Sequence, residues 1–426
     1  MEVTNQTVTS DFPVFTSKLD YFGRQLPTDV STQSEEIVRF NPTTPLSLDN
    51  QNIIQFEIPA HPSAFYNIKE SSLYVRCKIL KKAGGVLEAT DMVAYCNNFL
   101  HTLFKNVTIY ANNKIIYNAE GLYPYRSIIQ KLCTTQYADK NSLFEIESTN
   151  GEAGGEDVTI RQPLVNLSAE FEMCGSLCTD LTEISKFIPN GVALNIRLEK
   201  SDDKFCLISN QDTKEYKIQI LDCHFNLVRM NLLPSLFDVI QNKFEKEPAR
   251  IPYKCVRLRT LGIQTGSFSA VHESLFNGRL PDKVVIGLVS ATSFVGKLSQ
   301  NPFNFKHFNV SRVGVSADVY QTVNNYVTYN FTSNQYIEGL IHFNRVVGNK
   351  KQLGVNRTTF KDGKTLHAFT LSLANSEHSL APIKNGSVRI QIDFAQQTTE
   401  AIVCVVFGVF DNTLYIDRNR DISRDF

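Results

Sequence analysis

Apolar and polar residues alternate with a period of two along much of the chain after residue 50. Residues 73–79 place Leu73, Val75, Cys77 and Ile79 on one side, and residues 192–198 and 388–394 repeat the pattern. Side chains alternate between the two faces of a β-strand, so this pattern predicts antiparallel strands with one buried face. It excludes a mainly helical fold.

Two stretches depart from simple alternation. In residues 216–228 the apolar positions change phase near Ile220, which predicts a β-bulge. Residues 402–410 are apolar throughout, which predicts a strand buried on both faces. No apolar run reaches the roughly 18–20 residues that span a bilayer. The first residues also lack the basic and apolar regions of a secretory signal, so we expect an intracellular protein.

Helical patterns are few. Residues 233–246 carry an apolar stripe at helical spacing, with Pro234 near the start, and residues 123–133 predict a second, shorter helix. A new strand pattern begins near Arg250. We therefore predict that the first of these helices separates two β-rich domains.

The length of 426 residues fits two domains of roughly 200 residues each. Residues 1–50 are rich in Thr, Ser, Asn, Gln and Pro without a sustained period, which predicts an extended arm. The expected division is an amino-terminal arm (1–50), a first β-domain (51–232), a linking helix (233–247), a second β-domain (248–418) and a tail (419–426).

Two short stretches in the two halves resemble each other. NNFLHTLF at 97–104 and NPFNFKHF at 301–308 share Asn, Phe and Phe at the same positions, and an alternating strand follows each. With the helix between the halves, this match predicts a duplicated domain. We expect the phenylalanines of the second stretch to fold back and plug the open end of their own sandwich.

The zero net charge and the absence of known catalytic motifs argue against several classes of function. Lys+Arg and Asp+Glu both number 43, so the chain has no net charge and no basic patch of the kind that grips nucleic acid. Phosphate-binding loops, the HExxH zinc motif and the GxSxG nucleophile motif are absent from the sequence. We expect a protein that is not an enzyme, with no catalytic or cofactor-binding residues.

Candidate metal ligands are weak. Cys174 and Cys178 are spaced as a possible zinc half-site, with Cys206 and the Cys223–His224 pair further on, but no second pair has a matching spacing. We predict buried, reduced thiols there. His307 is predicted to be structural. The acidic loop at 151–157 lacks the alternating oxygen ligands of a calcium site. No metal site is expected.

The order of these patterns resembles a known family. Residues 56–80, 93–116 and 121–132 resemble the first jelly roll of Polinton/Maverick- and adintovirus-type major capsid proteins, and residues 278–315 resemble the second. Residues 386–422 resemble the closing strands. The most specific segments are NNFLHTLF, YPYR and NPFNFKHFN, and the resemblance covers most of residues 50–422.

The resemblance implies an all-β double jelly roll of the adenovirus hexon and tectivirus lineage: two eight-stranded antiparallel sandwiches with a few short helices. It implies a viral major capsid protein whose homotrimers form pseudo-hexagonal capsomers tiling an icosahedral shell. The implied partners are further copies of the chain, neighbouring capsomers and a penton or minor capsid protein. A contact with an internal membrane is a further expectation, and recognition of specific nucleic-acid sequences is not expected. The implied location is the virion, after assembly inside the host cell.

Two other classes of protein remain open. A carbohydrate-binding, lectin-like sandwich would need a cluster of aromatic and carboxylate residues on one set of loops. A cupin-type jelly-roll enzyme would need His and Glu metal ligands on adjacent strands. The eight histidines, at positions 61, 101, 224, 272, 307, 342, 367 and 378, show no such grouping.

Overall fold

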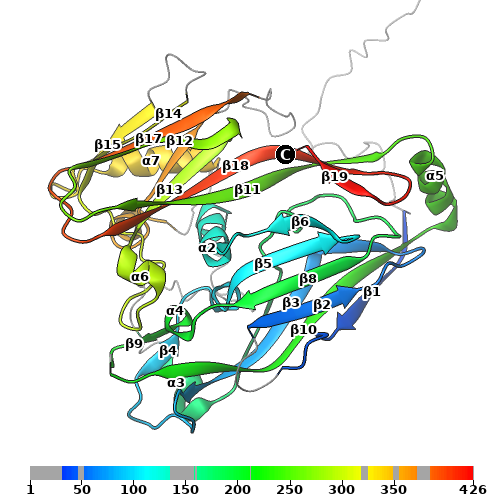
Figure 1. Ribbon diagram of the computed structural model, residues 1–426, viewed down its shortest axis with the longest axis horizontal. Helices are drawn as coiled ribbons and strands as arrows, with labels where there is room; N and C mark the ends of the chain where they lie inside the picture. The colour runs from blue at the N-terminus through cyan, green and yellow to red at the C-terminus, as the bar shows by residue number, and fades with distance from the viewer. Residues whose placement is uncertain are drawn as a thin grey trace, which may run out of the picture.

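A computed structural model of the chain describes residues 31–46, 52–134, 158, 161–211, 213–317, 325–348, 355–371 and 384–425. Its strands form two antiparallel β-sandwiches side by side, joined by one helix at the far end (Figure 1). No helix within these residues is both long and apolar enough to cross a bilayer.

The first sandwich consists of two four-stranded sheets. One has the strand order β1 (Thr32–Phe40), β10 (Tyr216–Leu232), β3 (Phe65–Lys81) and β7 (Phe171–Gly175). The other has the order β2 (Ile53–Ile58), β8 (Leu194–Lys200), β5 (Phe104–Ala111) and β6 (Lys114–Asn118). A short pair, β4 (Val93–Tyr95) and β9 (Leu207–Ser209), lies beside them.

The second sandwich repeats this plan. One sheet has the order β11 (Ala249–Ile263), β18 (Ile402–Ile416), β13 (Lys283–Ser290) and β16 (Leu366–Thr370), and β19 (Ile422–Arg424) pairs with β18. The other sheet has the order β12 (Ser269–Arg279), β17 (Asn385–Phe394), β14 (Val310–Ala317) and β15 (Asn325–Thr328).

Each sandwich therefore has eight strands in the same spatial order, with the first strand next to the last and the second next to the seventh. This is the jelly-roll arrangement, occurring twice. The strands β5 and β14, which follow the two similar stretches at 97–104 and 301–308, occupy the same place in their sandwiches. The predicted duplication is confirmed at this level.

Both predicted helices are present. They are α2 (Tyr123–Thr134) and α5 (Pro234–Phe244), and α5 joins the last strand of one sandwich to the first strand of the other. The pattern did not predict α7 (Ile337–Val347). Among the described residues, five shorter α-helices lie in connections: α1 (Phe99–Thr102), α3 (Gln162–Val165), α4 (Asp203–Cys206), α6 (Ala291–Val295) and α8 (Arg357–Lys361).

Two expected boundaries are wrong. Strand β1 lies inside the predicted arm but pairs with β10 from Thr32 to Phe40, because Val38 and Phe40 turn inward opposite the buried Leu227 and Phe225. The predicted tail contains β19, which pairs with β18. The rest of the arm, residues 1–30 and 47–50, lies outside the described residues, as does the acidic loop at 151–157.

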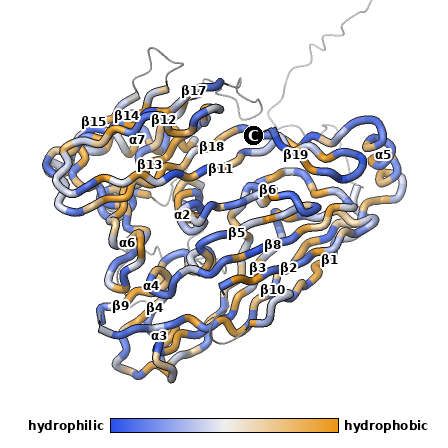
Figure 2. Tube along the Cα trace, in the orientation of Figure 1, coloured by the Kyte–Doolittle hydropathy of each residue, from blue (hydrophilic) through white to orange (hydrophobic). Residues whose placement is uncertain are grey.

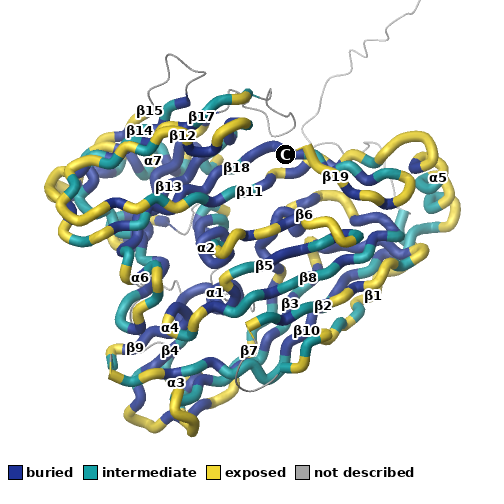
Figure 3. The backbone as a smooth tube through the Cα atoms, viewed as in Figure 1, coloured by how far each residue is buried: buried dark blue, intermediate teal, exposed yellow. Residues whose placement is uncertain are grey.

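Hydrophobic and hydrophilic residues alternate along the strands of both sandwiches (Figure 2). The bulge predicted near Ile220 is confirmed, because the pairing of β10 with β3 shifts register between Ile220 and Asp222. Strand β18 is buried along both faces, as predicted, whereas its counterpart β10 alternates between buried and half-buried residues from 216 to 219 and is half-buried throughout 219–222. Figure 3 shows β18 mostly dark blue, while β1 is largely yellow and teal.

Candidate functional site

The junction between the two sandwiches is built around an aromatic cluster. Tyr125 of α2 stacks on Phe294 of α6 with 5.1 Å between ring centroids, and it meets Phe303 edge-on at 5.6 Å. Its hydroxyl donates a 3.0 Å hydrogen bond to the carbonyl oxygen of Pro302. Phe205 of α4 also packs on Phe303, at 5.8 Å. Aromatic rings at this junction bury a large apolar area and fix its geometry.

The expected position of the second phenylalanine-rich stretch is therefore wrong. Phe303 lies against the first sandwich, and Phe305 lies over β13, where the ring fills the space that a side chain at Gly287 would need. The absence of a side chain at Gly287 leaves room for a ring on the outer side of the sheet. The loop joins the two sandwiches and does not plug its own.

A buried ion pair lies at the same junction. Arg126 of α2 approaches the Asp180 carboxylate at 2.7 Å, with side-chain exposures of 1% and 9%. The carboxylate also accepts a 3.1 Å hydrogen bond from the backbone N–H of Val256 in β11. The Arg126 guanidinium lies over the Tyr117 ring at 4.9 Å. One carboxylate thus connects the helix of the first sandwich to the first strand of the second.

Arg420 closes the other end of the junction. Its side chain donates to the Asn190 carbonyl at 2.8 Å and to the Gln241 side chain at 2.6 Å, and its guanidinium lies 3.9 Å from the centre of the Phe244 ring. Asn112 donates to the Arg420 carbonyl at 2.8 Å. These contacts join the first sandwich, α5 and the carboxyl-terminal segment. The aromatic cluster, the buried ion pair and Arg420 thus hold the two sandwiches against each other.

The sequence-based metal candidates do not converge. His224 and Cys174 flank Tyr74 on the outer face of the first sheet, and Tyr74 stacks on His224 at 4.5 Å. Cys223 points into the core instead, and Cys178 and Cys206 are buried elsewhere. Burial raises the pKa of the Cys206 thiol. Within the described ranges, no three His, Cys, Asp or Glu side chains are grouped to hold a metal ion.

His307 packs against an aromatic ring and bonds to the backbone. Its ring stacks on Phe331 at 4.2 Å, and its Nδ1 accepts a 2.9 Å hydrogen bond from the backbone N–H of Asn309. Burial lowers the pKa of His307, with a further contribution from Lys361. The neutral ring fits this position because it accepts a hydrogen bond and packs against an aromatic neighbour.

The sequence patterns did not indicate that each sandwich buries a histidine–tyrosine pair. His101 lies 2.7 Å from the Tyr123 hydroxyl in the first sandwich, and His367 lies 2.8 Å from the Tyr329 hydroxyl in the second. Burial lowers the pKa of His101 well below its usual value and that of His367 to about 3. Both rings are neutral in the folded chain at ordinary pH.

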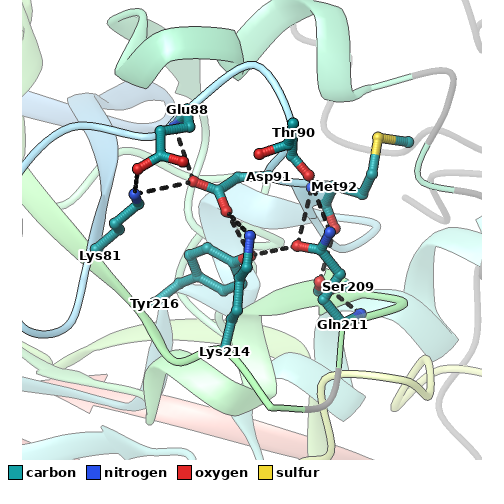
Figure 4. Close-up of polar contacts among 9 residues, drawn as sticks. All are labelled: Lys81, Glu88, Thr90, Asp91, Met92, Ser209, Gln211, Lys214 and Tyr216. Carbon is teal, nitrogen blue, oxygen red and sulfur yellow. Dashed lines mark hydrogen bonds and ion pairs between the residues drawn. The ribbon is translucent and has the colours of Figure 1, made fainter.

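A polar cluster around Asp91 fixes the connection that follows β3 (Figure 4). The buried carboxylate of Asp91 contacts the ammonium groups of Lys214 and Lys81 and accepts a 2.8 Å hydrogen bond from the backbone N–H of Glu88. Burial alone would raise the pKa of Asp91, but the bonds from Lys214 and Glu88 outweigh burial, and the pKa is lowered. The cluster is fully paired and holds one loop end in place.

Comparisons with known proteins agree with this architecture. No family model matches the sequence. An uncharacterized protein of Caenorhabditis elegans is 20% identical over 387 residues, which covers 86% of this chain and 92% of that protein.

Three solved structures extend the likeness. A chain of the Sputnik virophage structure superposes with a TM-score of 0.63 at 12% identity, over 97% of this chain and 93% of that one. The Faustovirus major capsid protein gives 0.58 at 10% identity, over 92% of each chain. The mavirus major capsid protein gives 0.54 at 11% identity, over 100% of this chain and 96% of that one. The shared feature is the fold, two jelly rolls along nearly the whole chain.

Proposed function

We propose that this chain is a viral-type major capsid protein whose homotrimers form pseudo-hexagonal capsomers of an icosahedral shell. The observation that carries the proposal is the junction: a buried ion pair, an aromatic cluster and Arg420 fix two jelly rolls as one block. A block with two similar lobes lets three copies form a ring with six lobes. The fold likeness to capsid chains over 92% or more of this chain supports the same role.

Within this class we propose the Polinton/Maverick- and adintovirus-type lineage, supported by the segments NNFLHTLF, YPYR and NPFNFKHFN. The proposed location is the virion, and the proposed partners are neighbouring capsomers and a penton or minor capsid protein. The role requires no cofactor and no catalytic step.

We further propose that the residues before β1 serve as an arm at the base of the capsomer, where they contact neighbours or a membrane surface. Their polar composition supports this role, because it offers little apolar area for folding alone. Deletion of residues 1–30, which spares β1, should leave trimers intact and reduce higher assembly, as seen by negative-stain imaging. Unchanged higher assembly would contradict the arm.

The test of the main proposal is the mass of the purified protein in solution. Light scattering coupled to size exclusion should give three times 48.1 kDa, and this mass should persist on dilution to micromolar concentration. Obligate interfaces of this kind bury above roughly 2,000 Å² per pair. A chain that stays monomeric at every salt concentration would contradict the capsid role.

A further inference from the structure

Within one chain, helix α2 and the outer face of β18 cover each other. Eight residues of α2 are buried, and the helix lies between the two sandwiches (Figure 1). Strand β18 is buried on both faces, because its inner face packs in its own sandwich and its outer face meets the first sandwich. Each member of this contact has a counterpart in the other half of the chain.

The counterpart of α2 is α7. Helix α2 lies in the connection from β6 to β7, and α7 lies in the equivalent connection from β15 to β16. Only Gly339, Phe343 and Val346 of α7 are buried, and they pack on its own sandwich. The opposite face presents Glu338, Ile341 and Arg345, and Ile341 is 62% exposed.

The counterpart of the outer face of β18 is the outer face of β10, since each is the last strand of its jelly roll and second in its sheet. Cys223 and Phe225 point into the core, so His224 points outward. We call this outer surface of the β1–β10–β3–β7 sheet the open face. It is lined by Ile37, Arg39, Tyr74, Arg76, Asp222 and His224.

The open face and α7 have complementary chemistry. Ile37 is 70% exposed on β1 and matches the exposed Ile341 as an apolar contact. Arg39 and Arg76, with side-chain exposures of 52% and 43%, are paired within the chain with Asp222 and Glu170. The open face therefore carries charges of both signs, as α7 does with Glu338 and Arg345. The stacked pair Tyr74–His224 supplies a flat aromatic surface between them. An apolar centre with charged surroundings is typical of interfaces between protein subunits.

We propose that α7 of one copy docks on the open face of the first sandwich of the next copy, and so repeats between chains the contact that α2 makes within the chain. This inference rests on the proposed function. The contact joins two different surfaces, so each copy offers one of each and the copies add head to tail. Three copies then close a ring in which every open face and every α7 is covered.

The first test uses two matched substitutions, Ile341→Asp on α7 and Ile37→Asp on the open face. A carboxylate at the centre of an apolar contact should weaken trimer association by at least roughly 30-fold, the size of a hot-spot loss. Val295→Asp is the control, because Val295 is 77% exposed on α6, away from both surfaces. Circular dichroism should show the same fold for all three variants. Light scattering should show that Ile341→Asp and Ile37→Asp are monomers and that Val295→Asp remains a trimer.

The second test mixes the two variants. A copy with Ile341→Asp retains an intact open face, and a copy with Ile37→Asp retains an intact α7. The mixture should form one-to-one dimers that stop at two copies, whereas neither variant should dimerise alone. Because both substitutions change the mass equally, one variant carries an affinity tag, and native mass spectrometry then distinguishes the two chains by mass.

The outcomes separate the two proposals. If the wild-type chain is trimeric but both aspartate variants also remain trimeric, the docking contact is wrong and the capsomer proposal stands. If the mixture contains no dimers while the single variants are folded monomers, the head-to-tail pairing is wrong. A wild-type chain that never associates overturns both proposals.

Discussion

The two similar stretches of the chain differ in what their aromatic residues contact. In the first sandwich, residues 99–102 of this stretch form α1, and Phe99 packs on Tyr95 and Phe171 of the same sandwich. In the second, residues 301–308 remain irregular, and Phe303 packs on Phe205 and Tyr125 across the junction. The aromatic residues of the first stretch pack in the core of their own sandwich, whereas those of the second stretch pack between the two sandwiches. Two stretches at the same place in a duplicated fold can therefore make different contacts.

The halves also differ in how charge is buried. The buried pair Arg126–Asp180 belongs to the first sandwich and contacts the second through the Val256 backbone. In the second sandwich, the ammonium group of Lys254 contacts the carboxylates of Asp282 and Asp411; these are 15% and 4% exposed, but the lysine side chain is 54% exposed, so only the acidic partners are buried. Of these two sites, the ion pair of the first sandwich is therefore the one that holds the junction together. Four measurements compare the two halves and their junction.

The largest effect is expected from Arg126→Met. Removing the guanidinium leaves Asp180 as a buried, unpaired carboxylate, which typically costs about 3–5 kcal/mol of folding stability. Urea unfolding should show the loss. The matched control is Lys82→Met, which also removes a cation from a carboxylate contact, but the side chains of Lys82 and Glu215 are 60% and 46% exposed, so it should cost less. Equal losses would contradict the special role of the junction pair.

Acid should weaken both halves through their buried histidines. The pKa of His367 is about 3 in the fold, so between its usual pKa near 6.5 and pH 3 the unfolded chain binds a proton that the folded chain does not. The contribution of neutral His367 to the free energy of unfolding is therefore fully present above pH 6.5 and is lost as the pH falls toward 3. At pH 4.5 the loss of folding stability from His367 is roughly 3 kcal/mol. Urea midpoints from pH 7.5 to 4.5 measure it.

The variant His367→Gln should flatten this pH dependence in part, and His101→Gln should act in the same direction in the first sandwich. The remaining slope in each single variant then reports the other half. A double variant with the full wild-type slope would show that the acid response comes from other groups.

A smaller effect is expected from Gly339→Ala in α7. A methyl group there would overlap the Tyr329 ring, so the helix must shift away from its sandwich. Overpacking of this kind costs about 1–3 kcal/mol. Gly262→Ala in β11 is the matched control, because nothing lies within 4 Å of its added methyl group. A neutral Gly339→Ala in thermal unfolding would contradict the close packing of α7.

The smallest effect is expected from Arg259→Met. Arg259 of the second sandwich approaches Glu120 of the first at 2.7 Å, but their side chains are 42% and 59% exposed. Exposed pairs contribute about 0.2–1 kcal/mol. The melting temperature should barely change, in contrast to Arg126→Met at the same junction. A large drop in the melting temperature would show that the exposed Arg259–Glu120 pair also holds the sandwiches together.

Much of the fold follows from local pattern. The alternation around Leu73 and Ile79 predicted strands correctly, and the phase change near Ile220 predicted the bulge. Strand β1 was missed because its first five residues, Thr32 to Glu36, are polar, and the backbone pairing with β10 holds it in the sheet. Helix α7 was missed although its apolar residues have helical spacing and Gly348 ends it in a left-handed conformation.

The junction could not be predicted in the same way. Arg126 lies within the YPYR segment, yet nothing near it in the sequence points to Asp180 or to Val256. Such contacts depend on how two sheets and a helix pack in space, and local patterns carry no information about distances between remote segments. The same holds for Tyr125 and Phe303, which lie 178 positions apart in the sequence but pack together in the folded chain.

The Arg420 contact also has a consequence for biosynthesis. Its partner Asn190 precedes it by 230 positions, and Gln241 and Phe244 belong to the connecting helix. During translation the first sandwich leaves the ribosome long before residue 420 is made, and domains fold in order of their synthesis. The space beside Gly191 that the Arg420 side chain occupies in the folded chain is therefore unfilled until the polypeptide is almost complete. Truncated chains therefore lack the Arg420 contacts, and only nearly complete chains can join the first sandwich and α5 to the carboxyl-terminal segment.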